Sequence, residues 1–322
     1  MGSRIIIKNW NLLIQKGALI YVLLIFCILT FGIGAPAMIG PKHLLELAVI
    51  ASSLGIVAAG QTLVMLTGMF DLSVGAVMTL VNVLGSGMLG GGQYNLGLVV
   101  VLLISLGALI GFINGYGITR LKIPPFMMTL AVWLVLRGIV LVYTKGAPKG
   151  TWPASIQFIG KGWLFGVFPV SILIWLCLTI AGIFWLKKTI WGRYIYATGG
   201  NPKTAFLSGI RTSSVIILVY IMSGIFSAIG GIVLSGYVGW GSFQVGGEDY
   251  LLKSIAAAVL GGTTFSGGVG GLSGTFGGAY LLTLIDSGLT MAGVGYAGRL
   301  IFTGSVIVIF TGLYEKLTSK TA

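Results

Sequence analysis

Residues 96–118, LGLVVVLLISLGALIGFINGYGI, decide the fold of this chain. The stretch carries no charged side chain and exceeds the roughly 20 residues that an α-helix needs to cross about 30 Å of hydrocarbon. A strand in lipid would leave its backbone groups unpaired, so we predict a transmembrane helix. Gly107, Gly111 and Gly115 recur every four residues, which puts them on one face and favours close packing against a neighbouring helix. The alternative role for this face is sliding against that neighbour.

The rest of the chain has the same apolar character. Apolar residues make up 56% of the 322 positions and charged residues only 8%, against about 25% charged in a soluble domain. The run at 249–262 is too short for a full crossing and could be a half-helix or a re-entrant element. We therefore expect an all-α integral membrane protein with about ten transmembrane helices, in which residues 1–322 form a single membrane domain. The expected spans are 17–34, 44–67, 72–90, 96–118, 124–144, 166–186, 213–236, 249–262, 272–290 and 299–314.

The N-terminal region imitates a secretory signal. Arg4, Lys8 and Lys16 precede an apolar stretch that starts at Ala18, and Ala35-Pro36-Ala37 follows it. Because this stretch is longer than the apolar part of a usual signal and many spans follow, we expect an uncleaved first span. With the N-terminus inside, twelve Lys and Arg residues fall in inner segments and five in outer loops. This bias predicts that both termini are cytoplasmic.

Several catalytic and ligand-binding motifs are missing from the sequence. No G-x-x-x-x-G-K-[ST] loop occurs that could cradle the phosphates of ATP. Two G-x-G-x-x-G matches, beginning at Gly85 and Gly293, follow no predicted strand and reflect the high glycine content. His43, placed in an outer loop, is the only histidine, which removes histidine triads and histidine-cluster metal sites. The net charge of +13 is spread over short loops, so we expect no enzyme, no metal or cofactor bound by this chain, and no nucleic-acid partner.

A few charged residues lie within or beside the apolar runs. Arg137 and Asp286 each fall inside a predicted span, where an unpaired charge costs at least about 3 kcal/mol. They could pair with one another or line a solute pathway. Asp71, in the stretch GMFDLSVG, is expected to cap a helix that starts at Leu72. The acidic pair Glu248-Asp249 lies outside by this topology.

The largest inner loop, residues 187–212, reads KKTIWGRYIYATGGNPKTAFLSGIRT. It mixes aromatic residues, two adjacent glycines and five basic residues, unlike a passive polar tether. Asn201 is suited to cap a helix with Pro202 at its first position, and Gly209 is suited to end it. We predict a helix of one to two turns at 202–208, presented to the cytoplasm, that a soluble partner could bind.

Five sequence blocks occur in an order that resembles the membrane permeases of ribose-type ABC importers, within the branched-chain amino acid/ribose permease superfamily. The resemblance covers nearly the whole chain, and the blocks are specific together although each alone would be weak. The blocks are GMFDLSVG (68–75), INGYGITRLKIPPFMMTL (113–130), LRGIVLVYTKG (136–146), GRYIYATGGNPKTAFLSGI (192–210) and IAAAVLGGTTFSGGVGGLSGT (255–275).

The resemblance implies a type II permease bundle, like that of a vitamin-B12 importer, in the cytoplasmic (inner) membrane of a prokaryote. It also implies the partners: cytoplasmic ATPase subunits that bind ATP and Mg, an extracytoplasmic solute-binding protein, and a second permease in a homodimer or heterodimer, all within membrane lipid. Residues 201–209 would be the coupling helix that docks into the ATPase, within the coupling loop 187–212.

The resemblance assigns two groups of residues. The first group lies in the coupling loop and would contact the ATPase, and the second belongs to the pathway or has a structural role. The coupling residues are Gly192, Arg193, Gly199, Gly200, Asn201, Pro202, Ala205, Ser208 and Gly209. The pathway or structural residues are Asp71, Asn114, Pro124, Pro125, Arg137 and Asp286.

The chain also departs from the family pattern. Lys203 stands where an acidic residue is common and Phe206 where a basic one is common, so the groove of the ATPase would be matched differently. Asp286-Ser287 replaces an Asn-rich pair, which bears on the solute. The implied function is uptake of a monosaccharide, a ribose-like pentose or a hexose. The alternatives are ATP-driven import of a nucleoside, amino acid or furanosyl signalling molecule, and a self-sufficient secondary carrier or channel.

Overall fold

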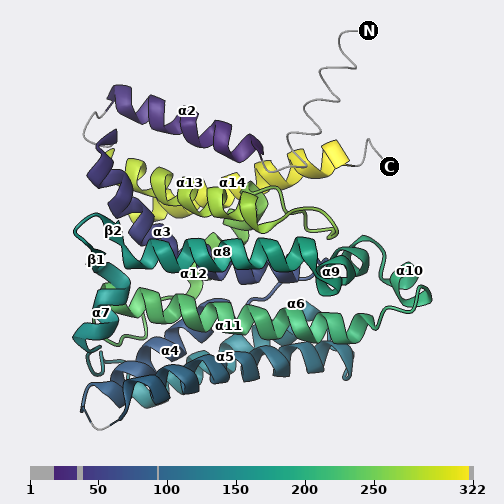
Figure 1. Cartoon of the computed structure of the whole chain (residues 1–322), viewed down its shortest axis with the longest axis horizontal. Coiled ribbons are helices and arrows are strands. Elements are labelled where there is room, and N and C mark those ends of the chain that lie inside the picture. Colours follow the sequence, from purple (N-terminus) through teal and green to yellow (C-terminus); the bar gives the residue numbers. More distant parts are fainter. Residues whose placement is uncertain (1–17, 35–38, 93, 319–322) are drawn as a thin grey trace.

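The computed structural model describes residues 18–34, 39–92 and 94–318 as a bundle of helices that run back and forth along its long axis (Figure 1). The signal-like residues Arg4, Lys8, Lys16 and 35–37 lie outside the described residues. A short hairpin, β1 (Trp163–Leu164) and β2 (Phe168–Pro169), lies at one end. The helices are α2 (Ala18–Gly34), α3 (Pro41–Met65), α4 (Val74–Leu89), α5 (Leu96–Thr119), α6 (Pro125–Thr144), α7 (Ala154–Lys161), α8 (Val170–Lys188), α9 (Ile190–Gly200), α10 (Pro202–Leu207), α11 (Thr212–Val238), α12 (Gly247–Leu260), α13 (Leu272–Met291) and α14 (Tyr296–Thr318).

Five of the described helices, α3, α5, α6, α8 and α11, are long and apolar enough to cross a membrane. Shorter apolar segments lie in α2 (Ile20–Thr30), α4 (Val74–Leu89) and α14 (Tyr296–Phe310). The predictions of an all-α chain and of several spans are therefore confirmed. Fewer than a third of the span residues in α5, α6 and α8 are buried, as expected for helices on the outside of a bundle in lipid.

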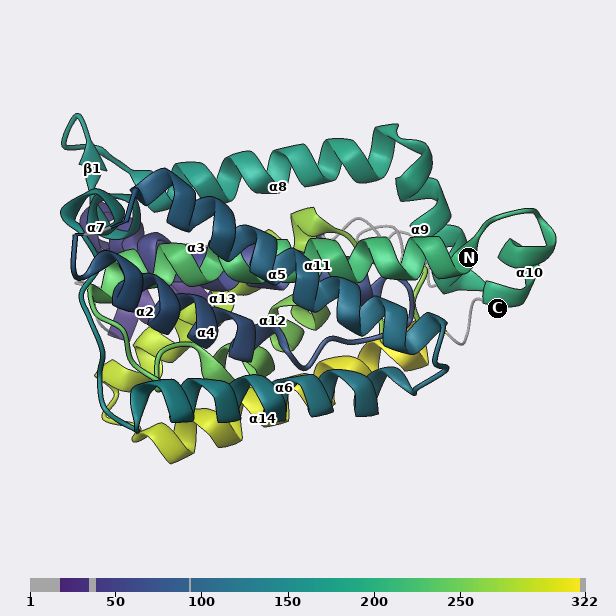
Figure 2. The same ribbon diagram turned by 90° about the horizontal axis from the view of Figure 1, so that it is seen from below.

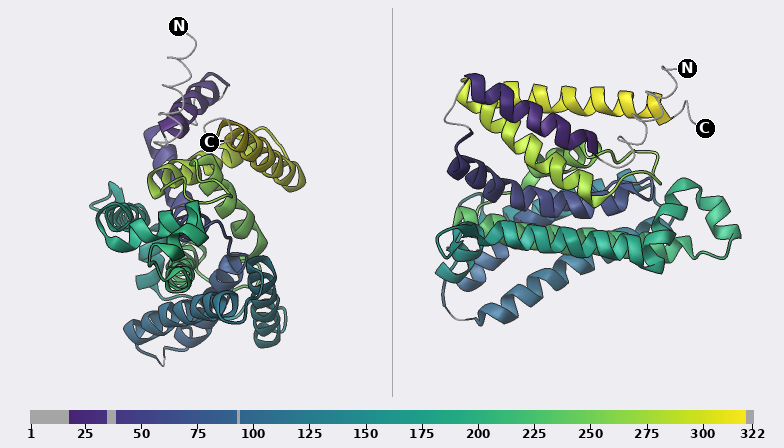
Figure 3. Two further views of the ribbon diagram at one scale, coloured as in Figure 1. Left: turned by 90° about the vertical axis from the view of Figure 1, so that its right-hand side faces the viewer. Right: turned by 45° about the horizontal axis from the view of Figure 1, so that its top comes forward.

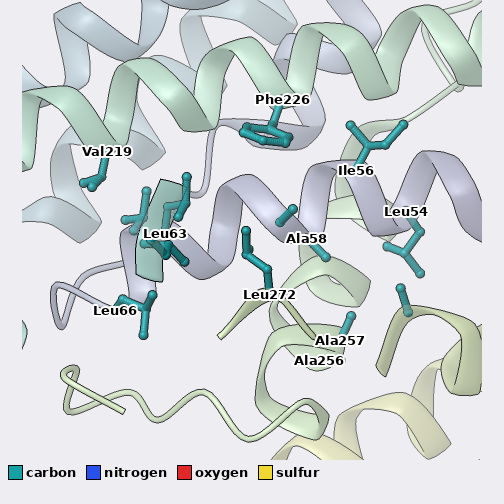
Figure 4. Packing of buried hydrophobic residues seen from close by; sticks show 14 of the residues in the cluster. Leu54, Ile56, Ala58, Leu63, Leu66, Val219, Phe226, Ala256, Ala257 and Leu272 are labelled. Atoms are coloured by element: carbon teal, nitrogen blue, oxygen red, sulfur yellow. The ribbon is translucent and has the colours of Figure 1, made fainter. Parts of the chain in front are cut away.

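Helix α3 is the centre of the bundle. Apolar or small residues occupy every side of α3 from Leu47 to Met65, which is the pattern of a helix that is buried all round. Nearly all residues of this stretch are buried in the structure. Figure 4 shows the α3 side chains Ile56 and Leu63 between α11, which contributes Phe226, and α12 and α13 on the other side. Because α3 contacts α8, α11, α12 and α13, it connects the elements that carry the functional candidates.

The glycine face predicted on residues 96–118 is a tight helix contact. A Cβ atom on Gly107 would overlap the backbone of Gly224, and one on Gly111 would overlap the backbone of Tyr220, both on α11. Gly115 lies against Ile217 of the same helix. The prediction of close packing is confirmed, and it makes α5 and α11 an extensively packed pair in which backbones approach directly.

Helix α12 is short, and a non-helical segment with a turn at 243–244 precedes it inside the bundle. At 14 residues, the helix is about 21 Å long. Residues 239–246, which precede it, run beside α4, so that Gly241 lies near Ser86 and Gly247 lies near Gly75. Asn82 holds this segment: its amide donates to the carbonyl of Trp240 (3.1 Å) and accepts from the backbone N–H of Ser242 (2.8 Å). Non-helical backbone inside a membrane bundle needs such internal partners.

Two predictions of local structure were wrong. Helix α4 begins at Val74 and not at Leu72, because residues 66–73 form turns after α3. His43 lies in the first turn of α3, not in a loop, since Pro41 starts that helix earlier than the apolar run alone indicates. The connection between α6 and α8 contains α7, and it is fastened to the bundle by the buried ring of Trp152 against Gly85.

Candidate functional site

Helix α10 projects beyond one end of the bundle (Figures 2 and 3). Asn201 caps it, because its Oδ1 accepts the backbone N–H groups of Lys203 and Thr204, both at 3.0 Å. Pro202 occupies the first helical position, and Gly209 has a positive φ of 85°, which suits glycine at a helix end. The local structure predicted for 202–208 is confirmed. The helix places Phe206 and Leu207 in solvent, with 68% and 84% of their surface exposed.

Helix α9 connects α10 to the interior through contacts between backbones. A Cβ atom on Gly199 would overlap the carbonyl of Leu66, the residue that ends α3. The same carbonyl accepts the N–H of Gly268, in the loop between α12 and α13 (2.9 Å). Gly267 lies against the backbones of Gly68 and Gly199. We call residues 66–68, 199–200 and 267–268 the glycine junction, because three chain segments meet there through their backbones.

Tyr196 adds a side-chain link at the same place. Its hydroxyl donates to the carbonyl of Gly270 at 2.9 Å, which ties α9 to the loop before α13. Burial raises the pKa of Tyr196, so the hydroxyl stays protonated and keeps donating this hydrogen bond at physiological pH. The glycine junction is therefore held by a hydrogen bond in addition to close packing.

Asp71 lies at the break between α3 and α4 and is 1% exposed. Its Oδ1 accepts from the backbone N–H and the hydroxyl of Ser73 (2.9 and 2.6 Å), and its Oδ2 accepts from the hydroxyl of Ser223 on α11 (2.9 Å). Asn114 of α5 donates to the hydroxyl of Ser73 (2.9 Å). These bonds tie the break before α4 to α11 through Asp71 and to α5 through Ser73, and they show that the expected cap at Leu72 is instead a turn closed on Ser73.

The charged residues of the bundle pair in a way that the sequence did not indicate. Arg137 on α6 forms an ion pair with Glu248 at the start of α12. Lys253, one helical turn further along α12, pairs with Asp249 at 2.9 Å and with Asp286 on α13 at 3.2 Å. The predicted possibility that Arg137 and Asp286 pair with one another is therefore wrong, because each has partners on other elements.

Arg299 on α14 completes this network. Its Nη1 lies 3.4 Å from Oδ1 of Asp286 and donates to the hydroxyl of Thr290 at 2.8 Å. The network therefore connects α6, α12, α13 and α14. We call the six residues Arg137, Glu248, Asp249, Lys253, Asp286 and Arg299 the charge network.

A cavity of about 340 Å³ lies between α4, α6 and the first residues of α12. Its walls include Thr79, Trp133, Arg137 and Glu248, and Tyr296 at the start of α14. Two smaller cavities of about 160 and 50 Å³ share Asp249, Lys253 and Asp286. The charge network thus borders neighbouring hollows of the bundle.

The remaining predicted residues have local roles that the structure shows. Pro124 and Pro125 start α6, as cap and first helical residue. Gly192 allows the sharp turn from α8 into α9, since a Cβ atom there would overlap the carbonyl of Leu186. Ala205 is the buried residue of α10, and its carbonyl accepts the N–H of Ile210 (3.1 Å). The other coupling candidates, Arg193, Gly200 and Ser208, are exposed.

Sequence reasoning missed four of the six residues in the charge network. Glu248 and Asp249 were assigned to an outer loop, and Lys253 was counted there as an orienting charge. The sequence feature that could have identified them is their position at the start of the apolar run 249–262, which is too short to cross a membrane. Charges at the start of a half-length helix face the interior of the bundle. Arg299 could have been identified in the same way, because it is the first residue of the expected span 299–314.

A family model described as branched-chain amino acid transport system / permease component matches residues 43–311. A ribose import permease protein of Bacillus subtilis (strain 168) is 38% identical over 284 residues, 87% of each chain. A fructose import permease protein of Rhizobium meliloti is 35% identical over 266 residues, 79% of this chain and 72% of the relative.

A third relative has a different solute in its name. An autoinducer 2 import system permease protein of Yersinia enterocolitica is 38% identical over 266 residues, 79% of this chain and 73% of the relative. No solved structure matches this chain significantly.

Proposed function

This chain belongs to the family described as branched-chain amino acid transport system / permease component, and we propose that it forms the membrane pathway of an ATP-driven importer for a monosaccharide. As a family member it is a permease subunit of a transporter and not an enzyme, and it is a multi-pass protein of the inner membrane. The proposed solute is a ribose-like pentose or a hexose, because relatives named for ribose and fructose cover most of the chain. A solute like that of the autoinducer 2 relative is the second candidate.

The observation that carries the proposal is the capped, projecting helix α10. A six-residue helix cannot be stable on its own, yet α10 is fixed at its start by Asn201 and projects two large apolar side chains into solvent. Exposed apolar residues on a fixed element are typical of a surface that binds another protein. The partner in this proposal is the cytoplasmic ATPase, which binds ATP and Mg.

The glycine junction would transmit the motion of α10. Backbones in direct contact cannot be compressed, so a displacement of α9 must move the turn after α3 and the loop before α13. The turn after α3 continues into Asp71 and α4, which borders the large cavity. In this mechanism, closure of the ATPase moves α10 and thereby changes which side of the membrane the pathway faces.

The complete transporter would contain two permeases, identical or different, and an extracytoplasmic solute-binding protein. Within each permease we propose about ten transmembrane helices in a type II arrangement like that of a vitamin-B12 importer, with residues 1–322 as one membrane domain. Both termini and the coupling loop 187–212 would be cytoplasmic. The excess of Lys and Arg in inner segments supports this orientation.

The test is reconstitution of the purified chain in proteoliposomes, with and without its ATPase and binding protein. We expect uptake of radiolabelled ribose or fructose only when both partners and ATP are present. Uptake driven by a solute or proton gradient through the chain alone would refute the proposal and establish a secondary carrier.

A further inference from the structure

We propose that the 340 Å³ cavity between α4, α6 and α12 is a solute-binding station inside the membrane domain, selective for neutral polyhydroxylated solutes through Arg137, Glu248 and Trp133. The inference rests on the proposed function, because it names the point in the pathway at which the sugar is recognised. It goes further by assigning selectivity to the permease itself in addition to the soluble binding protein.

The size of the cavity fits a small solute. Pockets for organic ligands run from about 300 to 1,000 Å³, so a cavity of about 340 Å³ is at the lower end, where a single sugar ring belongs. The cavity is built by four separate parts of the chain, α4, α6, the start of α12 and the first residue of α14. Figure 2 shows α6 and α14, two of these parts, on the same side of the bundle.

The charge of the surroundings fits a neutral solute. Of the six residues in the charge network, three are positive and three are negative, and every one is in an ion pair. Three of them, Arg137, Glu248 and Asp249, line the 340 Å³ cavity, where Arg137 pairs with Glu248. Asp249 is balanced by Lys253 at 2.9 Å, so the cavity offers no unpaired charge to a phosphorylated sugar or to a cation. A neutral sugar can exchange the hydration of its hydroxyl groups for hydrogen bonds to the lining, whereas an ion would lose hydration without gaining an oppositely charged partner that is not already paired.

The lining supplies the contacts that a sugar ring needs. Arg137 and Glu248 are paired yet remain 53% and 61% exposed, so both keep hydrogen-bonding capacity toward the cavity. Within the part of the chain that the structure describes, Oε2 of Glu248 accepts no hydrogen bond, and it could accept from a sugar hydroxyl. The guanidinium of Arg137 lies 5.0 Å from the ring centre of Trp133, which fixes the indole as an apolar surface for the C–H face of a sugar. Thr79 and Gln244 add uncharged polar groups.

The first experiment measures transport by the complete transporter carrying Glu248→Gln, with saturating binding protein. Loss of a charged hydrogen bond should lower the maximal rate of sugar uptake about tenfold or more, while ATP hydrolysis stimulated by the binding protein persists. Glu46→Gln is the matched control, because Glu46 is an exposed α3 residue that does not border the cavity, and it should transport like the wild type.

The second experiment detects the solute in the cavity directly. Gln244→Cys is introduced with Cys27 and Cys177 replaced by serine, and its labelling by a water-soluble maleimide is followed in the full transporter. Free ribose or fructose at millimolar concentration should abolish the labelling, whereas ribose 5-phosphate and leucine should not. Phe165→Cys, on the tip of the β1–β2 hairpin, is the control and should label equally in every solution.

The outcomes separate the two proposals. A wild-type transporter that imports sugar, combined with labelling of Gln244→Cys that sugar does not block and unchanged uptake by Glu248→Gln, overturns the binding station and leaves the importer standing. If ribose 5-phosphate blocks the labelling of Gln244→Cys as well as ribose does, the assigned selectivity for neutral solutes is overturned. Absence of ATP-dependent sugar uptake by the wild type overturns the proposed function itself.

Discussion

Replacement of Asn201 by alanine should uncouple ATP hydrolysis from transport. In the structure the side chain of Asn201 closes the N-terminus of α10 by accepting two backbone N–H groups at 3.0 Å. Alanine has no acceptor to offer them. The remaining anchors of this helix are the buried Ala205 and the turn at Gly209, so the cap is a large part of what orders it.

The size of the effect follows from the cap. Loss of an asparagine cap costs about 1 kcal/mol, and since 1.4 kcal/mol is a factor of ten, the ratio of folded to unfolded α10 should fall about fivefold. Before the ATPase binds, a six-residue helix held mainly by its cap is marginal, and we take a ratio of folded to unfolded α10 of about one for that state. The folded fraction would then drop from about one half to about one sixth, and the number of solute molecules imported per ATP should fall roughly threefold.

The assay measures uptake of labelled sugar and release of phosphate in the same proteoliposomes. Asn201→Ser retains a capping oxygen and should keep nearly the wild-type ratio of uptake to hydrolysis. Amounts of inserted protein should be equal for the three proteins, because Asn201 is exposed and lies outside the helices of the bundle. An unchanged ratio in Asn201→Ala would refute the view that an ordered α10 couples the two processes.

Two further predictions concern stability in detergent, measured as the midpoint of thermal unfolding. Gly111→Ala should lower the midpoint, because the new methyl group meets the backbone of α11 and overpacking typically costs about 1–3 kcal/mol, whereas Gly138→Ala meets no atom of the described residues within 4 Å and should not lower it. Equal midpoints would contradict the tight α5–α11 contact. Ser223→Ala should destabilise by about 1–3 kcal/mol because it leaves the carboxylate of Asp71 short of a donor. Ser227→Ala, one turn away and with no hydrogen bond at its hydroxyl within the described part of the chain, is the control, and an equal loss in both variants would argue against the role of Asp71.

The parts of the site that could be predicted from sequence depend on neighbouring residues. Asn201-Pro202 and Gly209 specify where a helix starts and stops through groups only a few residues apart, and the structure has that helix. The four-residue spacing of Gly107, Gly111 and Gly115 likewise defines one helix face, whichever helix it packs against.

The parts that could not be predicted depend on residues far apart in the chain. Asp71 was expected to serve its own helix, but its Oδ2 bonds to Ser223, which is 152 positions away. Arg137 and Asp286 were the visible intramembrane charges, yet Arg137 pairs with Glu248, 111 positions along the chain. No local pattern identifies which of several opposite charges will be nearest after folding.

Composition and local spacing by themselves determined that this chain is a helical membrane protein with a capped helix outside the bundle, because burial in lipid and backbone hydrogen bonding constrain each segment independently. Only the tertiary structure decided that residues 239–246 run beside α4 as non-helical chain with a turn at 243–244, and that α12 starts beside Gly75 of α4. That arrangement is what turns Glu248, Asp249 and Lys253 from apparent loop charges into residues that line cavities. The physical reason is that an ion pair or a cavity depends on distances between helices, which the order of residues along each helix does not contain.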